Sequence, residues 1–369
     1  MRILIAPDKF KGTLSAREVA DNIALGLHDV LPDAKIDIAP MADGGEGTAE
    51  VISEALRGSW IKCKAHDPLG REIEAHYGWI DQQKLAVMEM SEAAGMRRLR
   101  PGELNPETTS TFGVGEMILN PAKRGAEKII IGLGGSATND GGFGMARALG
   151  FRFELSEDQD KEEERVVDLV KLKDIEKPPD LMLPQIIAAV DVRNPLLGEN
   201  GATRVFGPQK GAKPDQIEKL EHALTRLADV VEKQFDLDNR DEPGAGAAGG
   251  LGFGLISFCG AKVRPGFDVV AEVVGLERQM QDVDLVITGE GSLDRQTLEG
   301  KTPGGVAQLA RKLGKRVFAM VGRATEHSDV RALFDGVYEN AKPGMSTEEN
   351  MKHAGELLRE NARELAKRL

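Results

Sequence analysis

The run from Lys128 to Gly144, KIIIGLGGSATNDGGFG, constrains the fold more than any other stretch of the chain. Ile129–Ile131 is a short β-branched block that predicts a buried strand. Glycines and small polar residues follow, and a helical pattern resumes at 145–149 and ends at Gly150. Strand, glycine loop and helix in this order can hold an anion, because loop N–H groups and the helix N-terminus carry partial positive charge. We favour a phosphate or carboxylate site here over a plain turn, which needs fewer glycines.

Composition narrows the class of protein. A chain of 369 residues predicts two domains, at about 150 residues per domain. The net charge of −12 and the aromatic content of 4% argue against a nucleic-acid partner, which calls for basic patches and stacking rings. Two cysteines without a CxxC motif indicate a reducing compartment. The chain opens directly as a strand and has no long apolar run, so we expect a soluble cytoplasmic protein with no membrane partner.

Short apolar strands alternate with amphipathic helices, which is typical of the α/β class. The rhythm is regular at both ends, whereas 61–276 carries most of the long Gly/Pro loops. The simplest arrangement is a Rossmann-like parallel-sheet domain from 1–60 plus 277–369, with a second α/β domain, 61–276, inserted and the active site in the interdomain cleft. The charged stretch 154–179 is interpreted as a solvated surface excursion. The expected strands are 3–6, 36–39, 85–88, 129–131, 186–190, 285–288, 317–321 and 336–338.

A charged loop, DKFKGTLS at 8–15, follows the first expected strand. Open α/β sheets bind ligands at this position. Lys11 could meet a phosphate or carboxylate as a point charge, or could simply be an exposed lysine. Ser15 begins a capping box with Glu18 and therefore predicts the start of a helix.

The loop MADGGEGT at 41–48 follows the second expected strand. It places two acids, Asp43 and Glu46, among three glycines just before a helix. Mg²⁺ takes one or two carboxylates together with waters and phosphate oxygens, so this pair could hold it. Helix capping alone would explain Thr48 but not the two acids.

Four more loops combine glycine with charged or polar residues. Asp191 ends an apolar strand, which is the usual position of a general base or metal ligand, although a surface-facing aspartate at a strand end is also common. The four loops are 132–144, 190–211, 243–254 and 284–304.

Matches to standard nucleotide motifs are incomplete. Gly132–Ala137 fits the dinucleotide fingerprint, but no second strand ends in an acid about 20 residues later. Gly300-Lys301-Thr302 resembles the end of a P-loop, but Arg295 stands where the first glycine of that motif should be. Scattered histidines and the lack of a GxSxG setting make zinc or α/β-hydrolase chemistry poor fits. The set indicates phosphate handling by a site unlike the P-loop.

Taken together, six segments resemble the type-1 glycerate kinase family in order and spacing over nearly the whole chain. The resemblance implies a Rossmann-like domain and a second α/β domain with a cleft between them. It also implies a kinase that uses ATP and Mg²⁺ to phosphorylate D-glycerate, with 2-phosphoglycerate favoured over 3-phosphoglycerate as product. The six segments are DKFKGTLSA at 8–16, MADGGEGT at 41–48, GLGGSATNDGGFGMARALG at 132–150, DVRNPLLG with VFGPQKGA at 191–212, PGAGAAGGLGFGL at 243–255 and DLVITGEGSLDRQTLEGKTPGGVA at 284–307.

Roles for individual residues follow from the chemistry of phosphoryl transfer, which asks for positioning and charge neutralisation. We assign Asp191 as general base, Lys11 as a catalytic cation, and Asp43 and Glu290 as the acids nearest the metal. Gly134–Asn139 and Gly246–Gly250 would be the anion cradles. The expected substrate- and phosphate-binding residues are Lys9, Ser15, Arg71, Gly134, Gly135, Ser136, Thr138, Asn139, Lys210, Gly246, Gly249, Gly250 and Lys301. The expected metal ligands are Asp43, Glu46, Glu290 and Asp294.

Two other function classes remain open at this point. A nucleotide-linked oxidoreductase would use the fingerprint at 132–137, and NAD(P)H would then give a saturable fluorescence change. A non-catalytic carboxylate-binding module would explain the glycine loops, but not five loop acids beside five loop cations. Turnover of ATP with glycerate separates the three.

Overall fold

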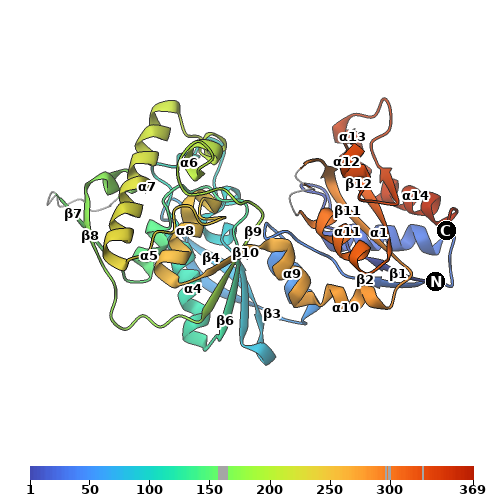
Figure 1. Cartoon of the computed structure of the whole chain (residues 1–369), viewed down its shortest axis with the longest axis horizontal. Helices are drawn as coiled ribbons and strands as arrows, with labels where there is room; N and C mark the ends of the chain where they lie inside the picture. The colour runs from blue at the N-terminus through green and yellow to red at the C-terminus, as the bar shows by residue number, and fades with distance from the viewer. Residues whose placement is uncertain (157–164, 296, 298–300, 326–327) are drawn as a thin grey trace. The chain divides into compact units, whose positions relative to one another are not determined.

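The computed structural model describes residues 1–156, 165–295, 297, 301–325 and 328–369. Part of the charged stretch, 157–164, and Gly300 of the glycine loop at 284–304 lie outside the described residues. The chain divides into two compact units (Figure 1). Unit 1 comprises Met1–Asp43, Glu50–Leu56 and Pro265–Leu369, and unit 2 comprises Gly44–Ala49 and Arg57–Arg264.

Unit 1 is built on a five-stranded parallel sheet in the order β13-β12-β11-β1-β2. Numbered by their order within the unit, the strands run 2-1-3-4-5, the flavodoxin-like doubly wound order. Ligands of such sheets bind outside the carboxyl ends of the strands where the order reverses, here β1 and β11. The strands are β1 (Arg2–Ile5), β2 (Lys35–Ile38), β11 (Leu285–Leu293), β12 (Arg316–Ala324) and β13 (Gly336–Glu339).

Helices cover both faces of this sheet. The β1-to-β2 and β11-to-β12 crossovers run in opposite directions, so right-handed connections place α1 and α11 on opposite faces. Helices α1 (Ala16–His28) and α14 (Ala354–Ala366) pack on each other and on the same face, around Ile3, Ile287 and Leu358. The other helices are α9 (Gly266–Val274), α10 (Leu276–Gln281), α11 (Thr302–Lys312), α12 (Ser328–Arg331) and α13 (Thr347–Lys352), and α2 (Thr48–Ala55) runs across the boundary of the units.

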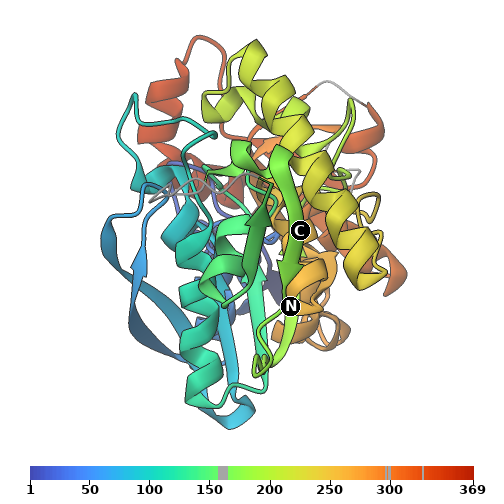
Figure 2. The same ribbon diagram turned by 90° about the vertical axis from the view of Figure 1, so that its left-hand side faces the viewer.

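Unit 2 contains a six-stranded mixed sheet in the order β10-β9-β6-β5-β4-β3. Figure 2 turns the molecule so that the left-hand side of Figure 1, where the strands and helices of unit 2 are labelled, faces the viewer. Strands β3, β4 and β5 pair antiparallel, whereas β5, β6 and β9 pair parallel and end at one common edge. The strands are β3 (Ser59–His66), β4 (Glu72–Ile80), β5 (Leu85–Glu89), β6 (Lys128–Gly132), β9 (Gln185–Val190) and β10 (Lys262–Pro265). A separate antiparallel pair joins β7 (Arg152–Leu155) to β8 (Leu172–Glu176).

The helices of unit 2 pack around this sheet. Helix α4 contacts β3 and α5, α8 contacts β9, and α7 covers β8 and η3. The α-helices are α3 (Ser91–Ala94), α4 (Phe112–Arg124), α5 (Phe143–Ala148), α6 (Ala202–Phe206), α7 (Pro214–Phe235) and α8 (Ala247–Cys259). The 3-10 helices are η1 (Asp81–Gln83), η2 (Met96–Arg98), η3 (Val166–Lys171) and η4 (Pro208–Lys210). Ala248, Gly249 and Gly250 are left-handed, so regular α8 begins after them.

The two units have bounds that differ from the expected 1–60 plus 277–369 and 61–276. Helix α9 belongs to unit 1 because it packs on α11, where Phe267 lies directly against Gly305. Residues 57–60 belong to unit 2, where β3 begins at Ser59 and pairs with β4. The segment 44–49 also belongs to unit 2, although it connects β2 to α2.

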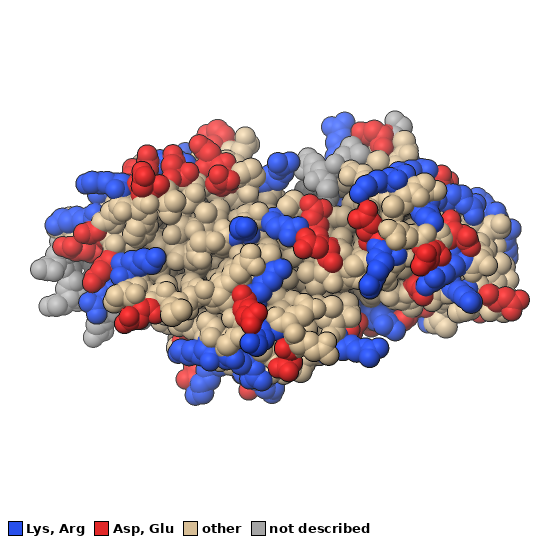
Figure 3. Space-filling model, turned by 60° about the horizontal axis from the view of Figure 1, so that its bottom comes forward, with Lys and Arg blue, Asp and Glu red and all other residues tan. Residues whose placement is uncertain are grey.

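Two further features concern the charges on the surface and the length and polarity of the helices. On the face shown in Figure 3, Lys and Arg side chains are interspersed with Asp and Glu side chains. Within the described part of the chain, every helix is too short or too polar to cross a membrane.

The crossing of α1 and α14 makes a prediction about Gly26. A Cβ at Gly26 would lie 2.4 Å from the carbonyl oxygen of Arg359, which is backbone and cannot rotate away. Alanine normally stabilises a helix interior over glycine by about 0.5–1 kcal/mol, but we expect Gly26→Ala to lower the free energy of unfolding by about 1–3 kcal/mol. The matched control is Gly355→Ala in α14, whose Cβ would meet the side chain of Asn22 at 3.0 Å. Denaturant unfolding compares them, and equal effects would contradict this packing argument.

Candidate functional site

A buried carboxyl group, Asp8, lies just beyond the carboxyl end of β1. The residue is 7% exposed. Its Oδ2 accepts a hydrogen bond from Thr302 Oγ1 at 2.7 Å, and its Oδ1 accepts one from the N–H of Lys9 at 2.7 Å. Burial raises the pKa of Asp8 to about 7, and the nearby carboxylate of Asp43 adds to this shift. The ammonium of Lys9 and the two hydrogen bonds act against it.

A second acid, Glu290, lies in the later half of β11, which pairs with β1. Thr297 Oγ1 donates a hydrogen bond to Glu290 Oε1 at 3.0 Å. Burial raises the pKa of Glu290 to about 8, and the carboxylates of Asp8 and Asp294 add to the shift, while Thr297 and Lys301 oppose it. These carboxyl groups therefore favour a proton, or a cation in its place, at the switch point of the sheet.

The acids of unit 1 fit a magnesium ion that keeps water and phosphate ligands. Among the residues that the structure describes, no three His, Cys, Asp or Glu side chains are placed to hold a metal by themselves. Mg²⁺ needs only one or two carboxylates when substrate phosphates complete its shell. Of the predicted metal ligands, Asp43 lies near Asp8 and Asp294 lies near Glu290, whereas Glu46 belongs to unit 2.

Other residues predicted in unit 1 have varied surroundings. Ser15 is the N-cap of α1, and its Oγ accepts the N–H of Glu18 at 3.2 Å, which accounts for this serine without a ligand. Lys11 is exposed on the loop that passes over Gly291. Lys301 stands at the N-cap position of α11 and lowers the pKa of Glu290 by its charge, although burial outweighs it.

In unit 2, the predicted anion loop after β6 is partly filled by its own acid, Asp140. This carboxylate is 1% exposed and accepts the N–H groups of Gly142 and Gly144 at 3.1 Å and that of Thr111 at 2.9 Å. Burial raises its pKa, and these hydrogen bonds oppose the shift. Helix α5, which begins at Phe143 rather than at the expected 145, therefore has its first N–H groups occupied. These N–H groups have acceptors within the protein itself.

Gly134 and Gly135 allow close packing of the segment 44–46. A Cβ at Gly134 would lie 2.5 Å from Gly45 Cα, and a Cβ at Gly135 would lie 2.8 Å from Glu46 Oε1. Both glycines are therefore required by contacts inside unit 2. The carboxylate of Glu46 lies directly on the predicted cradle.

Gly246, Gly249 and Gly250, in the second glycine loop, also allow close packing, here against residues of other loops of unit 2. Their Cβ atoms would lie 2.1 Å from Pro195 O, 2.0 Å from Thr138 O and 2.7 Å from Leu196 Cδ1. Packing against neighbouring loops thus explains these glycines.

The polar residues Ser136, Thr138, Asn139 and Lys210 are buried. Lys210 Nζ donates to the carbonyl oxygen of Thr138 at 2.7 Å, and Asn139 Nδ2 donates to Thr203 Oγ1 at 2.9 Å. Burial lowers the pKa of Lys210 to about 7, although the charge of Asp140 raises it. Lys210 thus contacts the predicted cradle from inside the protein and supports its backbone.

Asp191 and Arg71 both lie in unit 2. Asp191 follows β9 and is exposed. Arg71 donates from Nε to Asp67 at 2.5 Å and from Nη1 to Glu103 at 3.0 Å, so its charge is matched by two carboxylates of unit 2.

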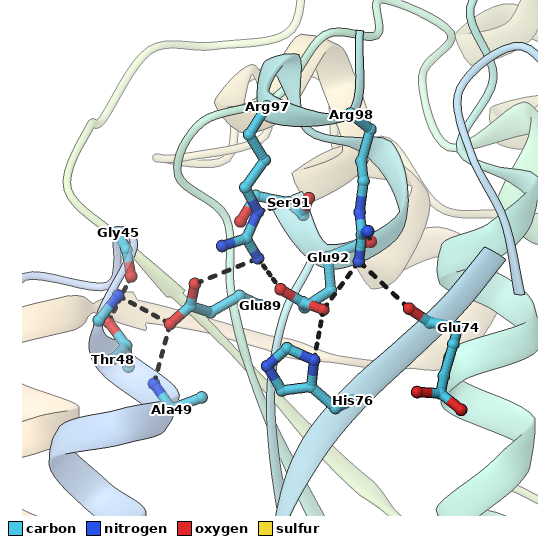
Figure 4. A network of polar contacts seen from close by, with 11 residues as sticks. Gly45, Thr48, Ala49, Glu74, His76, Glu89, Ser91, Glu92, Arg97 and Arg98 are labelled. Atoms are coloured by element: carbon cyan, nitrogen blue, oxygen red, sulfur yellow. Dashed lines mark hydrogen bonds and ion pairs between the residues drawn. The ribbon is translucent and has the colours of Figure 1, made fainter. Parts of the chain in front are cut away.

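A polar network at the end of β5 was not predicted (Figure 4). Glu89 Oε1 accepts the N–H groups of Gly47 at 2.8 Å and Ala49 at 3.1 Å. Its neighbour Glu92 is buried and pairs with three basic side chains: Arg97, Arg98 at 3.0 Å and His76 at 2.8 Å. The sequence did offer one signal for Glu89: an acid directly after the expected strand 85–88. The same pattern led to the prediction for Asp191.

Comparison with known proteins is consistent with this geometry. The model of the glycerate kinase family matches residues 3–369. A glycerate kinase of Halalkalibacterium halodurans is 40% identical over 370 residues, which cover 99% of this chain and 97% of that protein. The chain belongs to the glycerate kinase family.

Further members and a solved structure agree. The glycerate 2-kinase of Escherichia coli is 42% identical over 329 residues, covering 88% of this chain and 86% of that protein. A crystal structure described as glycerate kinase 2 of Salmonella typhimurium LT2 matches with a TM-score of 0.87 at 41% identity, covering 100% of this chain and 98% of that chain. The predicted family, the kinase class and the two-domain α/β fold are confirmed.

The raised pKa of Glu290 in this glycerate kinase fold predicts a pH dependence of stability. The folded state holds a proton on Glu290 up to pH about 8, whereas the unfolded state releases it near the ordinary value of 4.5. Between these values the unfolded state binds fewer protons, so stability falls as pH rises, by up to about 1.4 kcal/mol per pKa unit.

Denaturant unfolding of the metal-free protein between pH 5 and pH 9 measures this effect. We expect Glu290→Gln to flatten the fall, and the exposed control Glu348→Gln to leave it unchanged. Parallel curves for all three proteins would contradict the assignment.

Proposed function

We propose that the chain uses ATP and Mg²⁺ to phosphorylate D-glycerate and forms 2-phosphoglycerate. The observation that carries the proposal is a pair of acids at the switch point of the parallel sheet in unit 1, the buried Asp8 and the half-buried Glu290, whose pKa values are both raised. Mg²⁺ held there would neutralise charge on the phosphate oxygens of ATP. Phosphorylation at the 2-hydroxyl is supported by the name of the E. coli relative, a glycerate 2-kinase that is 42% identical.

The residues near this pair suit phosphate binding. Asp43 lies near Asp8, and Asp294 lies near Glu290. The ammonium groups of Lys9 and Lys301 also act on these two acids, and they would offset the negative charge of the carboxylates so that a phosphate group could bind. Lys11, exposed on the loop after β1, can reach a phosphate oxygen as a point charge.

Unit 2 would supply the groups for glycerate. The glycine-rich turn from Gly134 to Ser136 would lie beside the bound glycerate, with the Glu46 carboxylate against the left-handed Gly135. Asp191 is exposed after a buried strand, so its carboxylate can accept the proton of the glycerate hydroxyl. That oxygen then bonds to the γ-phosphorus of ATP as the bond to the leaving ADP oxygen breaks.

The state of the cysteines supports a reducing, cytoplasmic setting for this reaction. Cys63 and Cys259 are both free. Burial raises the pKa of Cys63 to about 11 and that of Cys259 to about 12, so both thiols stay protonated at neutral pH.

Substrate and metal dependence test the proposal. A coupled assay measures the release of ADP. We expect this release to require ATP, D-glycerate and Mg²⁺ together. D-Lactate, which keeps the 2-hydroxyl, should react detectably, whereas 3-hydroxypropionate, which lacks it, should not. Undiminished turnover in excess EDTA, or none with D-glycerate, would contradict the proposal, and the reverse preference between the analogues would assign the 3-hydroxyl.

The base assignment makes a second prediction. Asp191→Asn keeps the shape of the side chain but removes the proton acceptor, so we expect kcat to fall by about 10²–10⁴-fold with little change in KM. Asp241→Asn, another exposed carboxylate of unit 2, is the matched control and should keep full kcat. If only KM for ATP rises in Asp191→Asn, Asp191 belongs to the nucleotide or metal site instead.

A further inference from the structure

The segment 44–49 follows a strand of unit 1 but is held by unit 2. A Cβ on Gly44 would lie 2.8 Å from the carbonyl oxygen of Ala189, at the end of β9. A Cβ on Gly132 would lie 2.6 Å from the carbonyl oxygen of Gly44, at the end of β6. The segment thus lies on the common carboxyl edge of the parallel strands in unit 2, with its backbone in direct contact with theirs.

Glu89, the last residue of β5, fixes the other end of this segment. One oxygen, Oε1, accepts the N–H groups of both Gly47 and Ala49, at 2.8 and 3.1 Å. The second oxygen, Oε2, faces Arg97 Nη2 at 3.9 Å (Figure 4). The Glu89 side chain is only 10% exposed, so water offers the two N–H groups little replacement for this acceptor.

The anchored stretch carries Glu46, which directly precedes Gly47. Glu46 Oε1 lies 2.8 Å from the point where a Cβ of Gly135 would stand. The carboxylate of Glu46 therefore meets the predicted cradle at the left-handed turn of Gly135. A shift of the segment 44–49 would carry this carboxylate away from the turn.

We propose that Glu89 is a positioning residue for phosphoryl transfer, which holds the segment 44–49 so that the Glu46 carboxylate stays against Gly135. The inference rests on the proposed function in one respect: Glu46 is taken to act on the glycerate that the turn at Gly135 would border. Glu89 itself touches neither substrate nor metal in this account. Its contribution is the geometry of Glu46.

Two conservative variants separate positioning from charge. Glu89→Gln keeps an oxygen that can accept both N–H groups, although its amide then faces Arg97. Glu89→Asp keeps the charge but withdraws the carboxylate by one methylene. We expect Glu89→Gln to keep most of kcat and Glu89→Asp to lose about 10²-fold, because a misplacement of about 1 Å can cost that much. In both variants the KM for D-glycerate should stay within about threefold of the wild-type value. Glu72→Gln, exposed on β4, is the matched control.

A double-mutant cycle tests whether Glu89 acts through Glu46. In a Glu46→Gln background we expect Glu89→Asp to reduce kcat by less than about threefold, because the group it positions is gone. Additive losses, or a larger loss in Glu89→Gln than in Glu89→Asp, would overturn the proposal.

Hydrogen exchange of the peptide spanning 44–55 gives a readout that does not need turnover. We expect the Gly47 and Ala49 amides to exchange faster in Glu89→Asp and at the wild-type rate in Glu89→Gln. Unchanged exchange in both variants would overturn the anchoring itself. The two proposals can fail separately. If exchange at Gly47 and Ala49 responds to the variants as expected but the wild-type protein does not turn over glycerate, the proposed function is contradicted and the anchoring by Glu89 is not.

Discussion

The interaction on which the rest of unit 1 depends is between two largely dehydrated carboxyl groups at the carboxyl edge of one parallel sheet. Asp8 and Glu290 are far apart in the sequence, and the pairing of β1 with β11 brings them to one switch point. Burial favours their neutral forms, so each needs a proton, a hydrogen-bond donor or a cation. Thr302 and Thr297 supply donors, yet both pKa values stay raised. The fold thus keeps in place two groups whose ionisation a bound cation would favour.

In unit 2 the corresponding constraint is steric. Gly134, Gly135, Gly246 and Gly249 each leave room for another loop at less than 3 Å from the missing Cβ. The sequence predicted an anion site from this richness in glycine, and the structure supplies a second reason for it, since neighbouring loops pack directly against these glycines. Asp140 occupies N–H groups at the start of α5, and the turn before it remains beside the proposed glycerate site.

Local pattern predicted the buried parallel strands but missed the others. The expected strands at 3–6, 85–88 and 129–131 overlap β1, β5 and β6, because strands covered on both faces are continuous apolar runs. The missed β3 has lysines and one exposed face, as an edge strand does, so its pattern is weak. Among site residues, Asp8 follows the end of β1 and Glu290 comes just after the expected strand 285–288, so both were open to prediction. The partners of Glu89 lie some 40 positions away and required the tertiary structure.

Proton release on nucleotide binding tests the central claim, that buried carboxyl groups of unit 1 exchange protons for a metal–nucleotide. Calorimetric titration of Mg·ADP into the protein at pH 7, in buffers of different ionisation enthalpy, counts the protons released. The account predicts net release, because Asp8 and Glu290 hold protons with pKa values of about 7 and 8. It predicts that the release disappears in the double variant Asp8→Asn with Glu290→Gln. Binding of Mg·ADP with no proton release in the wild-type protein would contradict it.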